Sequence, residues 1–488
     1  MTLWDLALRL TSQWYWVVPF ILAYLGVIMT ILLDNKNPAK SIAYIMLLAL
    51  VPVLGLVVYY FFGRDYRKQR IFNLKGAVDS PVIESFWTDH RLEFERRFER
   101  TEKQFGDLIA PARLIFNQHQ GVLSEHNKIT LLINGESKFP EVLRSLEQAK
   151  HHIHMEYYIF SYDDIGEKVV DILMRKAKEG VEIRIIIDDF GSQKNRKMVR
   201  RLRKAKVEVY RFMPVTFPFL AQANFRNHRK IIVIDGRVGF EGGINIDERY
   251  INSGKHRLYW RDTHIKVEGP LVNQLQLQFL LSWHFTAKRK FPFERPYFGN
   301  EFETNGDATA TLVASGPDSP RPYCMEAILA AINQAKERIW IVTPYFIPTD
   351  QIITALQIAA SNGVDVQMIL PGKSDSHVVK HASLSYIRPL LRSGIRIFFY
   401  EKGFAHAKTM TFDGKVAIIG TANMDTRSFY INFEIAAVIY DKKLCEEVDK
   451  SFVNDLKQSK EVTFRDWSKR SFYNRLLDSV CRLLTPLL

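Results

Sequence analysis

The second half of this chain repeats the order of segments found in the first half, and this internal repeat restricts the possible folds more than any other feature. Each half contains short runs rich in β-branched and aromatic residues, separated by longer amphipathic stretches. The matching runs are 150–160 with 336–346, 180–187 with 363–370, 207–210 with 395–398, and 227–236 with 405–414. A repeat that occurs only twice is typical of a duplicated domain and not of a solenoid.

The spacing of these runs predicts strands that alternate with helices. Residues 165–179 and 350–361 are the expected crossover helices of the two halves. We therefore predict an α/β fold with two tandem α/β/α sandwich domains that form one pseudo-twofold site between them. The expected boundaries are 71–125 for a helical connector, 126–295 for the first domain, 296–460 for the second domain, and 461–488 for a basic C-terminal segment.

Two uncharged runs precede the repeat, at residues 14–33 and 41–63. Each is long enough to cross a hydrocarbon core of about 30 Å, so we expect a transmembrane hairpin within residues 1–70. A secretory signal peptide is the alternative for the first run, but this run is too long and lacks an Ala-x-Ala-like cleavage site. More basic residues follow the second run than lie between the runs, which predicts a cytoplasmic catalytic part. Those that follow are Arg64, Arg67, Lys68, Arg70 and Lys75.

The formal net charge of +14 favours an anionic partner, either a nucleic acid or an acidic lipid surface. The chain has three widely spaced cysteines, Cys324, Cys445 and Cys481. This spacing argues against a disulfide framework and against a cysteine zinc site, and it suits a reducing compartment.

Each half contains a His-x-Lys motif with an aspartate five residues after the lysine. In the first half it consists of His228, Lys230 and Asp235. In the second half the same residue types stand 178 positions later, at His406, Lys408 and Asp413. A turn of small residues and an asparagine, Asn245 or Asn423, follow each motif. Two copies in register make a chance match negligible.

These residue types suit the exchange of phosphodiesters. A neutral imidazole can attack phosphorus and form a phosphohistidine, while a second imidazole protonates the departing oxygen. His and Lys two positions apart on a strand would point to the same face, and the two lysines would hold the phosphate oxygens without any metal or cofactor. Asn245, Asn423 and Thr421 are the expected additional groups that bind the substrate phosphate.

Two kinds of carboxylate accompany the motifs. Asp235 and Asp413 belong to the candidate catalytic set as members of the motif, but each precedes a glycine in a tight hairpin and is expected to act structurally. A histidine that acts as a nucleophile also needs a group that orients its second nitrogen. Asp262 and Glu434, which follow the motifs in their halves, are the expected orienting carboxylates.

The doubled pattern resembles the hallmark of the phospholipase D superfamily. Four further features are similar to the bacterial cardiolipin synthases of that superfamily: the two N-terminal runs, residues 343–348, residues 432–434, and the end at residues 485–488. The resemblance implies that one phosphatidylglycerol donates its phosphatidyl group to another at the inner membrane of a bacterium, next to anionic lipid. It also implies that His228 is the nucleophile and His406 the general acid and then base. One departure is Gly243, which lacks the hydroxyl that Thr421 has.

Other functions remain open from the sequence. A phospholipase D-type hydrolase, or a transphosphatidylase with another alcohol as acceptor, would use the same motifs. A membrane-tethered nuclease would also suit the basic composition, but two membrane spans would confine the enzyme to lipid, so no nucleic acid is expected. A non-catalytic scaffold is disfavoured because both motifs are intact. The C-terminal segment has apolar residues at helical spacing among basic ones, and it would either lie on anionic lipid or pack against the enzyme.

Overall fold

The computed structural model describes residues 18–19, 21–33, 38–59, 81–118, 121–193, 195–214, 224–288, 295–299, 302, 306–483 and 485. The chain divides by its contacts into two compact units. One unit comprises Met1–Asn73 with Thr216–Asn224, and the other comprises Leu74–Val215 with Phe225–Leu488. Both motifs and the whole internal repeat belong to the second unit.

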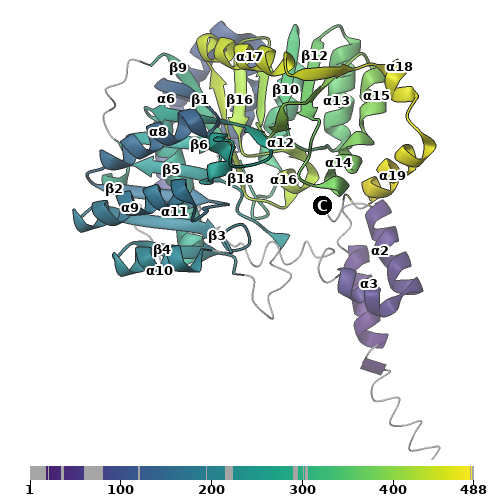
Figure 1. The fold of residues 1–488 in the computed structure, drawn as a ribbon, viewed down its shortest axis with the longest axis horizontal. Helices are drawn as coiled ribbons and strands as arrows, with labels where there is room; N and C mark the ends of the chain where they lie inside the picture. Colours follow the sequence, from purple (N-terminus) through teal and green to yellow (C-terminus); the bar gives the residue numbers. More distant parts are fainter. Residues whose placement is uncertain are drawn as a thin grey trace, which may run out of the picture. The chain divides into compact units, whose positions relative to one another are not determined.

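In the described part of this second unit, one sheet of 15 strands runs through both halves of the repeat (Figure 1). The first half supplies β1 (Ser124–Ile133), β2 (His152–Tyr157), β3 (Glu182–Asp188), β4 (Glu208–Phe212), β5 (Lys230–Ile234), β6 (Val238–Gly242) and β8 (Thr263–Glu268). The second half supplies β9 (Ala308–Ser315), β10 (Arg338–Val342), β12 (Asp365–Pro371), β13 (Arg396–Tyr400), β15 (Thr409–Phe412), β16 (Val416–Gly420), β18 (Glu434–Tyr440) and β19 (Ser459–Val462).

The strand order shows the duplication directly. It is β4-β3-β2-β5-β6-β8-β1 in the first half and β9-β18-β16-β15-β10-β12-β13-β19 in the second half. The halves join where β1 pairs antiparallel with β9. The expected strands and the α/β class are therefore confirmed, and the two sandwich domains share one continuous sheet.

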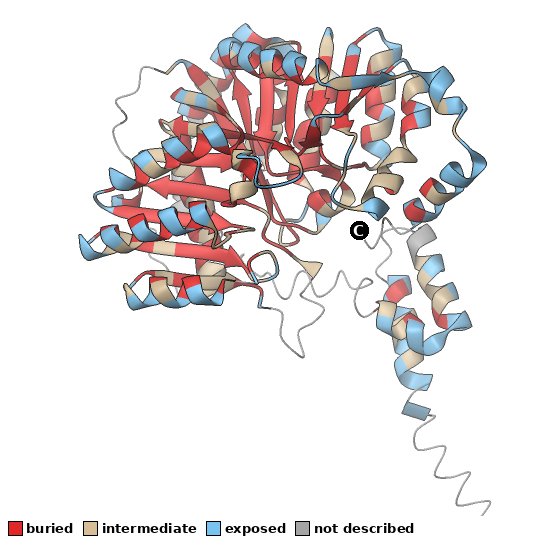
Figure 2. Ribbon diagram, in the orientation of Figure 1, coloured by how far each residue is buried: buried red, intermediate tan, exposed pale blue. Residues whose placement is uncertain are grey.

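Helices cover both faces of this sheet, so that each half is a three-layer sandwich. On the first half, α8 (Asn134–Glu147), α9 (Asp164–Lys178) and α10 (Arg196–Lys204) cover one face, and α11 (Leu271–Ala287) covers the other. On the second half, the matching helices are α12 (Tyr323–Gln334), α13 (Asp350–Ser361) and α15 (Ile387–Arg392) on one face and α17 (Lys442–Leu456) on the other. Figure 2 shows the buried sheet between the partly exposed helices.

The sequence explains why these segments form these layers. All five residues of β5, Lys-Ile-Ile-Val-Ile, are buried, as suits a strand that is covered on both faces. Helix α9 begins where Asp163 accepts a hydrogen bond from the Gly166 backbone at 2.9 Å. Its apolar stripe, which includes Val169 and Leu173, packs against the sheet.

The remaining described elements of this unit lie around the sheet or connect its strands. They are α6 (Pro81–Phe105), α7 (Ala110–Asn117), α14 (His377–Leu384), α16 (Thr426–Tyr430), α18 (Phe464–Ser468), α19 (Phe472–Leu483), the 3-10 turns η2 (Gly106–Ile109), η4 (Glu248–Ile251) and η5 (Arg295–Tyr297), and the short strands β7 (Tyr259–Arg261), β11 (Phe346–Ile347), β14 (Gly403–Ala405) and β17 (Met424–Asp425). Two of these short strands, β7 and β14, pair in parallel across the two halves.

The N-terminal unit contains helical residues 21–33, α2 (Pro38–Leu50) and α3 (Pro52–Val58). Gly55 lies so close to α2 that a Cβ placed on it would be 2.7 Å from the Leu48 Cα atom. Within the described ranges, no helix has both the length and the apolar character needed to cross a membrane. The expected spans 14–33 and 41–63 lie partly outside the described residues, at 14–17, 20 and 60–63.

Candidate active site

The two motifs meet where the halves of the sheet join. His228 precedes β5, and His406 lies between β14 and β15, so both histidines lie in loops and not on strands. The expectation that strand alternation aligns His with Lys is therefore wrong. Instead, each lysine side chain folds back, and the Nζ atoms of Lys230 and Lys408 donate hydrogen bonds to the carbonyl oxygens of His228 and His406.

The backbone N–H group of each histidine donates a hydrogen bond to a residue of the other half. The backbone N–H of His228 donates to the Phe433 carbonyl oxygen at 2.9 Å, and that of His406 donates to the Arg261 carbonyl oxygen at 2.7 Å. The parallel pairing of β7 with β14 extends the second contact over three residues. Each histidine therefore lies beside the segment that follows the motif of the opposite half.

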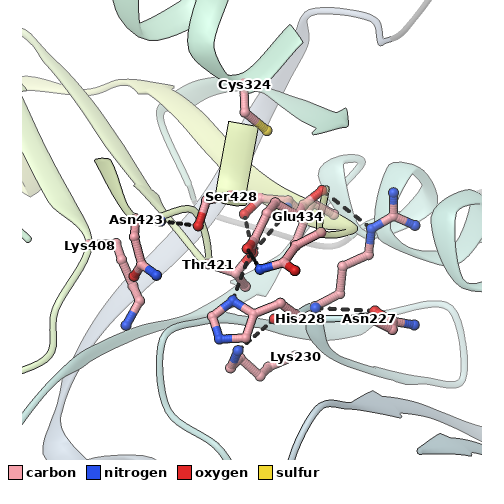
Figure 3. Close-up of polar contacts among 12 residues, drawn as sticks. Asn227, His228, Lys230, Cys324, Lys408, Thr421, Asn423, Ser428 and Glu434 are labelled. Atoms are coloured by element: carbon pink, nitrogen blue, oxygen red, sulfur yellow. Dashed lines mark hydrogen bonds and ion pairs between the residues drawn. The ribbon is translucent and has the colours of Figure 1, made fainter. Parts of the chain in front are cut away.

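These contacts between the halves decide which carboxylate orients which histidine. Nδ1 of His228 lies 2.9 Å from Oε2 of Glu434, and Nδ1 of His406 lies 2.6 Å from Oδ2 of Asp262 (Figure 3 for the His228 pair). Asp262 and Glu434 were the expected orienting residues, and the structure brings both to a histidine of the other half. With Nδ1 facing a carboxylate, Nε2 of each ring carries the lone pair that can reach a substrate.

Both carboxylates are buried, and hydrogen bonds and nearby lysines keep them ionised. Burial opposes ionisation of Glu434, but the hydrogen bond with His228 and the charge of Lys230 outweigh it and lower the pKa of this carboxyl. Burial likewise opposes ionisation of Asp262, but the charge of Lys408 and the hydrogen bond with His406 outweigh it, and the pKa of Asp262 is also lowered. The site therefore balances two carboxylates against two lysines before an anionic substrate enters.

The two halves support their carboxylates differently. In the second half, the Thr421 hydroxyl donates to Oε2 of Glu434 at 2.5 Å and accepts from the Ile435 backbone N–H at 2.9 Å. In the first half the corresponding residue is Gly243, where a Cβ would lie 2.1 Å from Oδ1 of Asp262. The hydroxyl of Thr421 thus serves Glu434, and we revise its expected role from phosphate binding to positioning. Gly243 is required because Asp262 occupies the space of a side chain.

Burial also sets the proton affinity of the motif residues. It lowers the pKa of Lys230 to about 7 and that of Lys408 to about 8, although nearby carboxylates oppose the change. It lowers the pKa of His406 to about 3, helped by Lys408, and it lowers the pKa of His228 as well. Both imidazoles are therefore neutral near pH 7 in the empty site, as a nucleophile requires.

Aromatic rings that no sequence motif predicted surround the histidines. Tyr158 lies edge-on to His228, with ring centroids 5.0 Å apart. The ring centroids of Trp260 and Phe404 lie 5.2 and 5.4 Å from that of His406. Trp260 and Phe404 could have been found, because each stands two positions before a site residue, Asp262 or His406.

The two asparagines of the glycine turns have different surroundings. The Asn245 amide is engaged at both ends, since its oxygen accepts from the Ile159 backbone at 3.1 Å and its nitrogen donates to the Tyr250 hydroxyl at 3.0 Å. Asn423 lies beside Lys408 in Figure 3, and its buried side-chain oxygen has no hydrogen-bond partner among the described residues. Asn423 is therefore the better placed of the two for contact with a substrate.

The motif aspartates have structural contacts. The carboxylate of Asp235 accepts backbone N–H groups of Lys150, His151 and His152 at 2.8 to 2.9 Å. Asp413 accepts those of residues 336–338 at 2.8 to 3.2 Å. Each aspartate has a positive φ, 53° and 52°, at the start of a hairpin turn that a glycine continues. Each thus fixes the start of a neighbouring strand, β2 or β10, to the end of the motif strand.

In the part of the chain that the structure describes, no three His, Cys, Asp or Glu side chains are grouped so that they could hold a metal ion.

Comparisons with known proteins show which family this chain is similar to. A family model described as "Cardiolipin synthase, PLD-like domain" matches residues 142–278 and 328–456, and one described as "Phospholipase_D-nuclease N-terminal" matches residues 12–64. The cardiolipin synthase of Alkalihalophilus pseudofirmus is 39% identical over 476 residues, covering 96% of this chain and 93% of that protein. The cardiolipin synthase of a Geobacillus species is 40% identical over 461 residues, covering 93% and 90%.

A solved structure supports the fold independently. The crystal structure of phosphatidylserine synthase from Haemophilus influenzae aligns with a TM-score of 0.58 at 14% identity, covering 74% of this chain and 95% of that chain. This likeness concerns the fold alone. The two matched segments of the first family model take up more than half of the sequence, and the relatives align with nearly all of it. The chain therefore belongs to the family of phospholipase D-like cardiolipin synthases.

Proposed function

We propose that this enzyme transfers a phosphatidyl group from one phosphatidylglycerol to a second one through a phosphohistidine on His228, giving cardiolipin and glycerol. The observation that carries the proposal is the crossed pairing of His228 with Glu434 and of His406 with Asp262 at 2.9 and 2.6 Å. Two oriented imidazoles, each with a lysine of its own motif beside it, are the groups that a two-step phosphoryl exchange needs.

In the first step, Nε2 of His228 attacks phosphorus, and the bond between phosphorus and the glycerol oxygen breaks. Protonated His406 gives its proton to that oxygen, so glycerol leaves as a neutral alcohol. His406 is neutral in the empty site, and the negative charge of the bound phosphodiester raises its proton affinity. Asp262 stabilises the imidazolium that forms, as a carboxylate does in a catalytic triad.

In the second step, the hydroxyl of the second phosphatidylglycerol attacks the phosphohistidine. Neutral His406 removes the proton of this hydroxyl, and the bond between phosphorus and His228 breaks. His406 takes up one proton from solvent when the phosphodiester binds and returns one to solvent when cardiolipin leaves, so protons and bonds balance over the cycle. Lys230 and Lys408 bind the non-bridging oxygens and stabilise the charge that develops on them, and the reaction needs no cofactor.

The lipid substrate and the membrane location belong to the same proposal. The relatives are named cardiolipin synthases, and the family match over residues 12–64 coincides with the two uncharged runs of the sequence. We propose that these runs insert the enzyme into the bacterial cytoplasmic membrane with its catalytic part in the cytoplasm. Hydrolysis by water in place of the second phosphatidylglycerol is the competing outcome of the same phosphohistidine.

The test uses the purified full-length chain in liposomes that contain phosphatidylglycerol, with lipid products identified by mass spectrometry and released glycerol measured enzymatically. We expect one glycerol for each cardiolipin formed. A His406→Ala variant, checked by its melting temperature for intact folding, provides the control. Phosphatidic acid as the main product would show a hydrolase, and the absence of any lipid product would contradict the proposal.

A further inference from the structure

The C-terminal helix α19 packs against the enzyme along one side only. Asp478 and Cys481 are buried on this side, and the helix lies beside α14 (Figure 1). Oδ1 of Asp478 lies 2.8 Å from Nδ1 of His381 on α14, and its Oδ2 accepts a hydrogen bond from Arg470 at 2.5 Å. These contacts fix how α19 is rotated about its own axis.

The opposite side of α19 carries large apolar residues in water. Figure 2 shows that most of the helix is exposed. Phe472, Tyr473 and Leu483 are each more than 70% exposed. Leu476 and Val480 are nearly half exposed. At about 100° per residue, all five lie within roughly a third of the helix circumference, so they form one continuous apolar face. We call these five residues the α19 face.

Positive charge borders this face. Arg475 and Arg482 are exposed and lie along one flank of it. Lys469, which is also exposed, stands just before the helix. The acidic Asp478 is already held by Arg470 and His381. The flank therefore presents cations to anything that covers the α19 face.

We propose that the α19 face docks onto the surface of an anionic lipid bilayer, with its apolar side chains among the acyl chains and Arg475 and Arg482 at the lipid phosphates. An apolar face beside a basic flank is the pattern of helices that lie in the membrane interface. A second copy of the chain would fit poorly, because a symmetric contact would bring the arginines against their own equivalents. The inference rests on the proposed function only in that the substrate is an anionic lipid.

Docking through α19 would also hold one wall of the active site at a fixed height above the bilayer. Helix α14, on which α19 packs, contacts β11, where the Ser383 hydroxyl accepts from the Phe346 backbone at 3.3 Å. Strand β11 pairs in turn with β17, which begins one residue after Asn423. The α19 face is thus joined through packed elements to the loop that carries a candidate substrate contact.

The test places an environment-sensitive fluorescent label on Leu476→Cys in the full-length chain, with a label on Ile358→Cys as the matched control. Ile358 is an equally exposed apolar residue on α13, and the three native cysteines are buried. The labelled proteins are reconstituted in vesicles of phosphatidylcholine, with or without an equal share of phosphatidylglycerol, and in detergent. Quenching by a lipid-borne nitroxide then reports contact with acyl chains without any need for turnover.

We expect a blue-shifted label at position 476 that the nitroxide quenches strongly in vesicles with phosphatidylglycerol, and an unquenched label at position 358. The variant Arg475→Gln/Arg482→Gln should lower the ratio of lipid-exposed to water-exposed label about fivefold for each arginine removed, corresponding to roughly 1 kcal/mol per charge. The control Lys442→Gln/Lys450→Gln, which removes two exposed cations from α17, should leave the ratio unchanged.

Three outcomes would overturn the inference. Equal quenching at both positions would show no specific docking of α19. A label at position 476 that is already shielded in detergent at high dilution would show that another segment of this chain covers the face. Shielding that rises with protein concentration would show a second copy. Quenching at position 476 in a protein that makes no cardiolipin would uphold the docking while contradicting the proposed function.

Discussion

The difference between Gly243 and Thr421 allows the two half-sites to be tested against each other. Replacing Gly243 with Thr introduces a Cβ at a position that lies 2.1 Å from Oδ1 of Asp262, so the carboxylate must move away from His406. Loss of the orienting carboxylate in a catalytic triad reduces kcat by about 10⁴. We therefore expect Gly243→Thr to reduce kcat by about 10² to 10⁴ with a smaller effect on KM.

The second half shows how a threonine can be accommodated, because there the longer side chain of Glu434 reaches its histidine past Thr421. Asp262→Glu alone should reduce kcat by roughly tenfold. The double variant Gly243→Thr/Asp262→Glu should be more active than the product of the single effects, by a coupling energy of about 1 to 3 kcal/mol.

The assay is cardiolipin formation in phosphatidylglycerol liposomes, with melting temperatures of all three variants as the control for folding. Strictly multiplicative effects, or a double variant less active than Gly243→Thr, would refute the idea that the Gly–Asp and Thr–Glu pairs are alternative solutions to the same contact.

Three further predictions follow from the site. Thr421→Val should reduce kcat by about 10- to 100-fold because Glu434 loses a hydrogen bond, whereas Thr421→Ser should retain most of the activity; equal losses would assign the effect to packing. Because the pKa values of Lys230 and Lys408 are lowered to about 7 and about 8, the lysines lose charge as the pH rises through this range, and KM for phosphatidylglycerol should increase in two transitions, near pH 7 and near pH 8. Lys230→Arg should remove the lower of these two transitions, and an unchanged pH profile would argue against the role of Lys230. Activity should persist in excess chelator because the lysines neutralise the phosphate oxygens, and a strict need for one divalent ion would contradict this role.

Local sequence patterns were sufficient for the strands, the crossover helices and the motif residues. The buried runs are continuous, and His, Lys and Asn recur at the same spacing in both halves. The sequence also predicted the two orienting carboxylates, since Asp262 directly precedes β8 and Glu434 begins β18, the corresponding strands of the two halves.

The pairing of these carboxylates could not be read locally, because the partners are separated by 206 residues in one pair and 144 in the other. It depends on the joining of β1 with β9 and on the contacts of β7 with β14. The role of Thr421 was missed for a similar reason. A hydroxyl next to a glycine turn suits phosphate binding, and only the position of Glu434 in space shows that the hydroxyl is already used.

The phosphohistidine is the central claim, and it can be measured with a donor whose leaving group needs no acid. Phosphatidyl-p-nitrophenol should react with the His406→Ala variant, and the second step should then be slow because no base removes the proton of the acceptor. Proteolytic digestion at neutral or alkaline pH, which preserves phosphohistidine, followed by mass spectrometry of this variant should locate one phosphatidyl group on His228. The same adduct should be absent from the His228→Ala variant. An adduct on any other residue, or cardiolipin formation by His228→Ala at near-normal rates, would contradict the account.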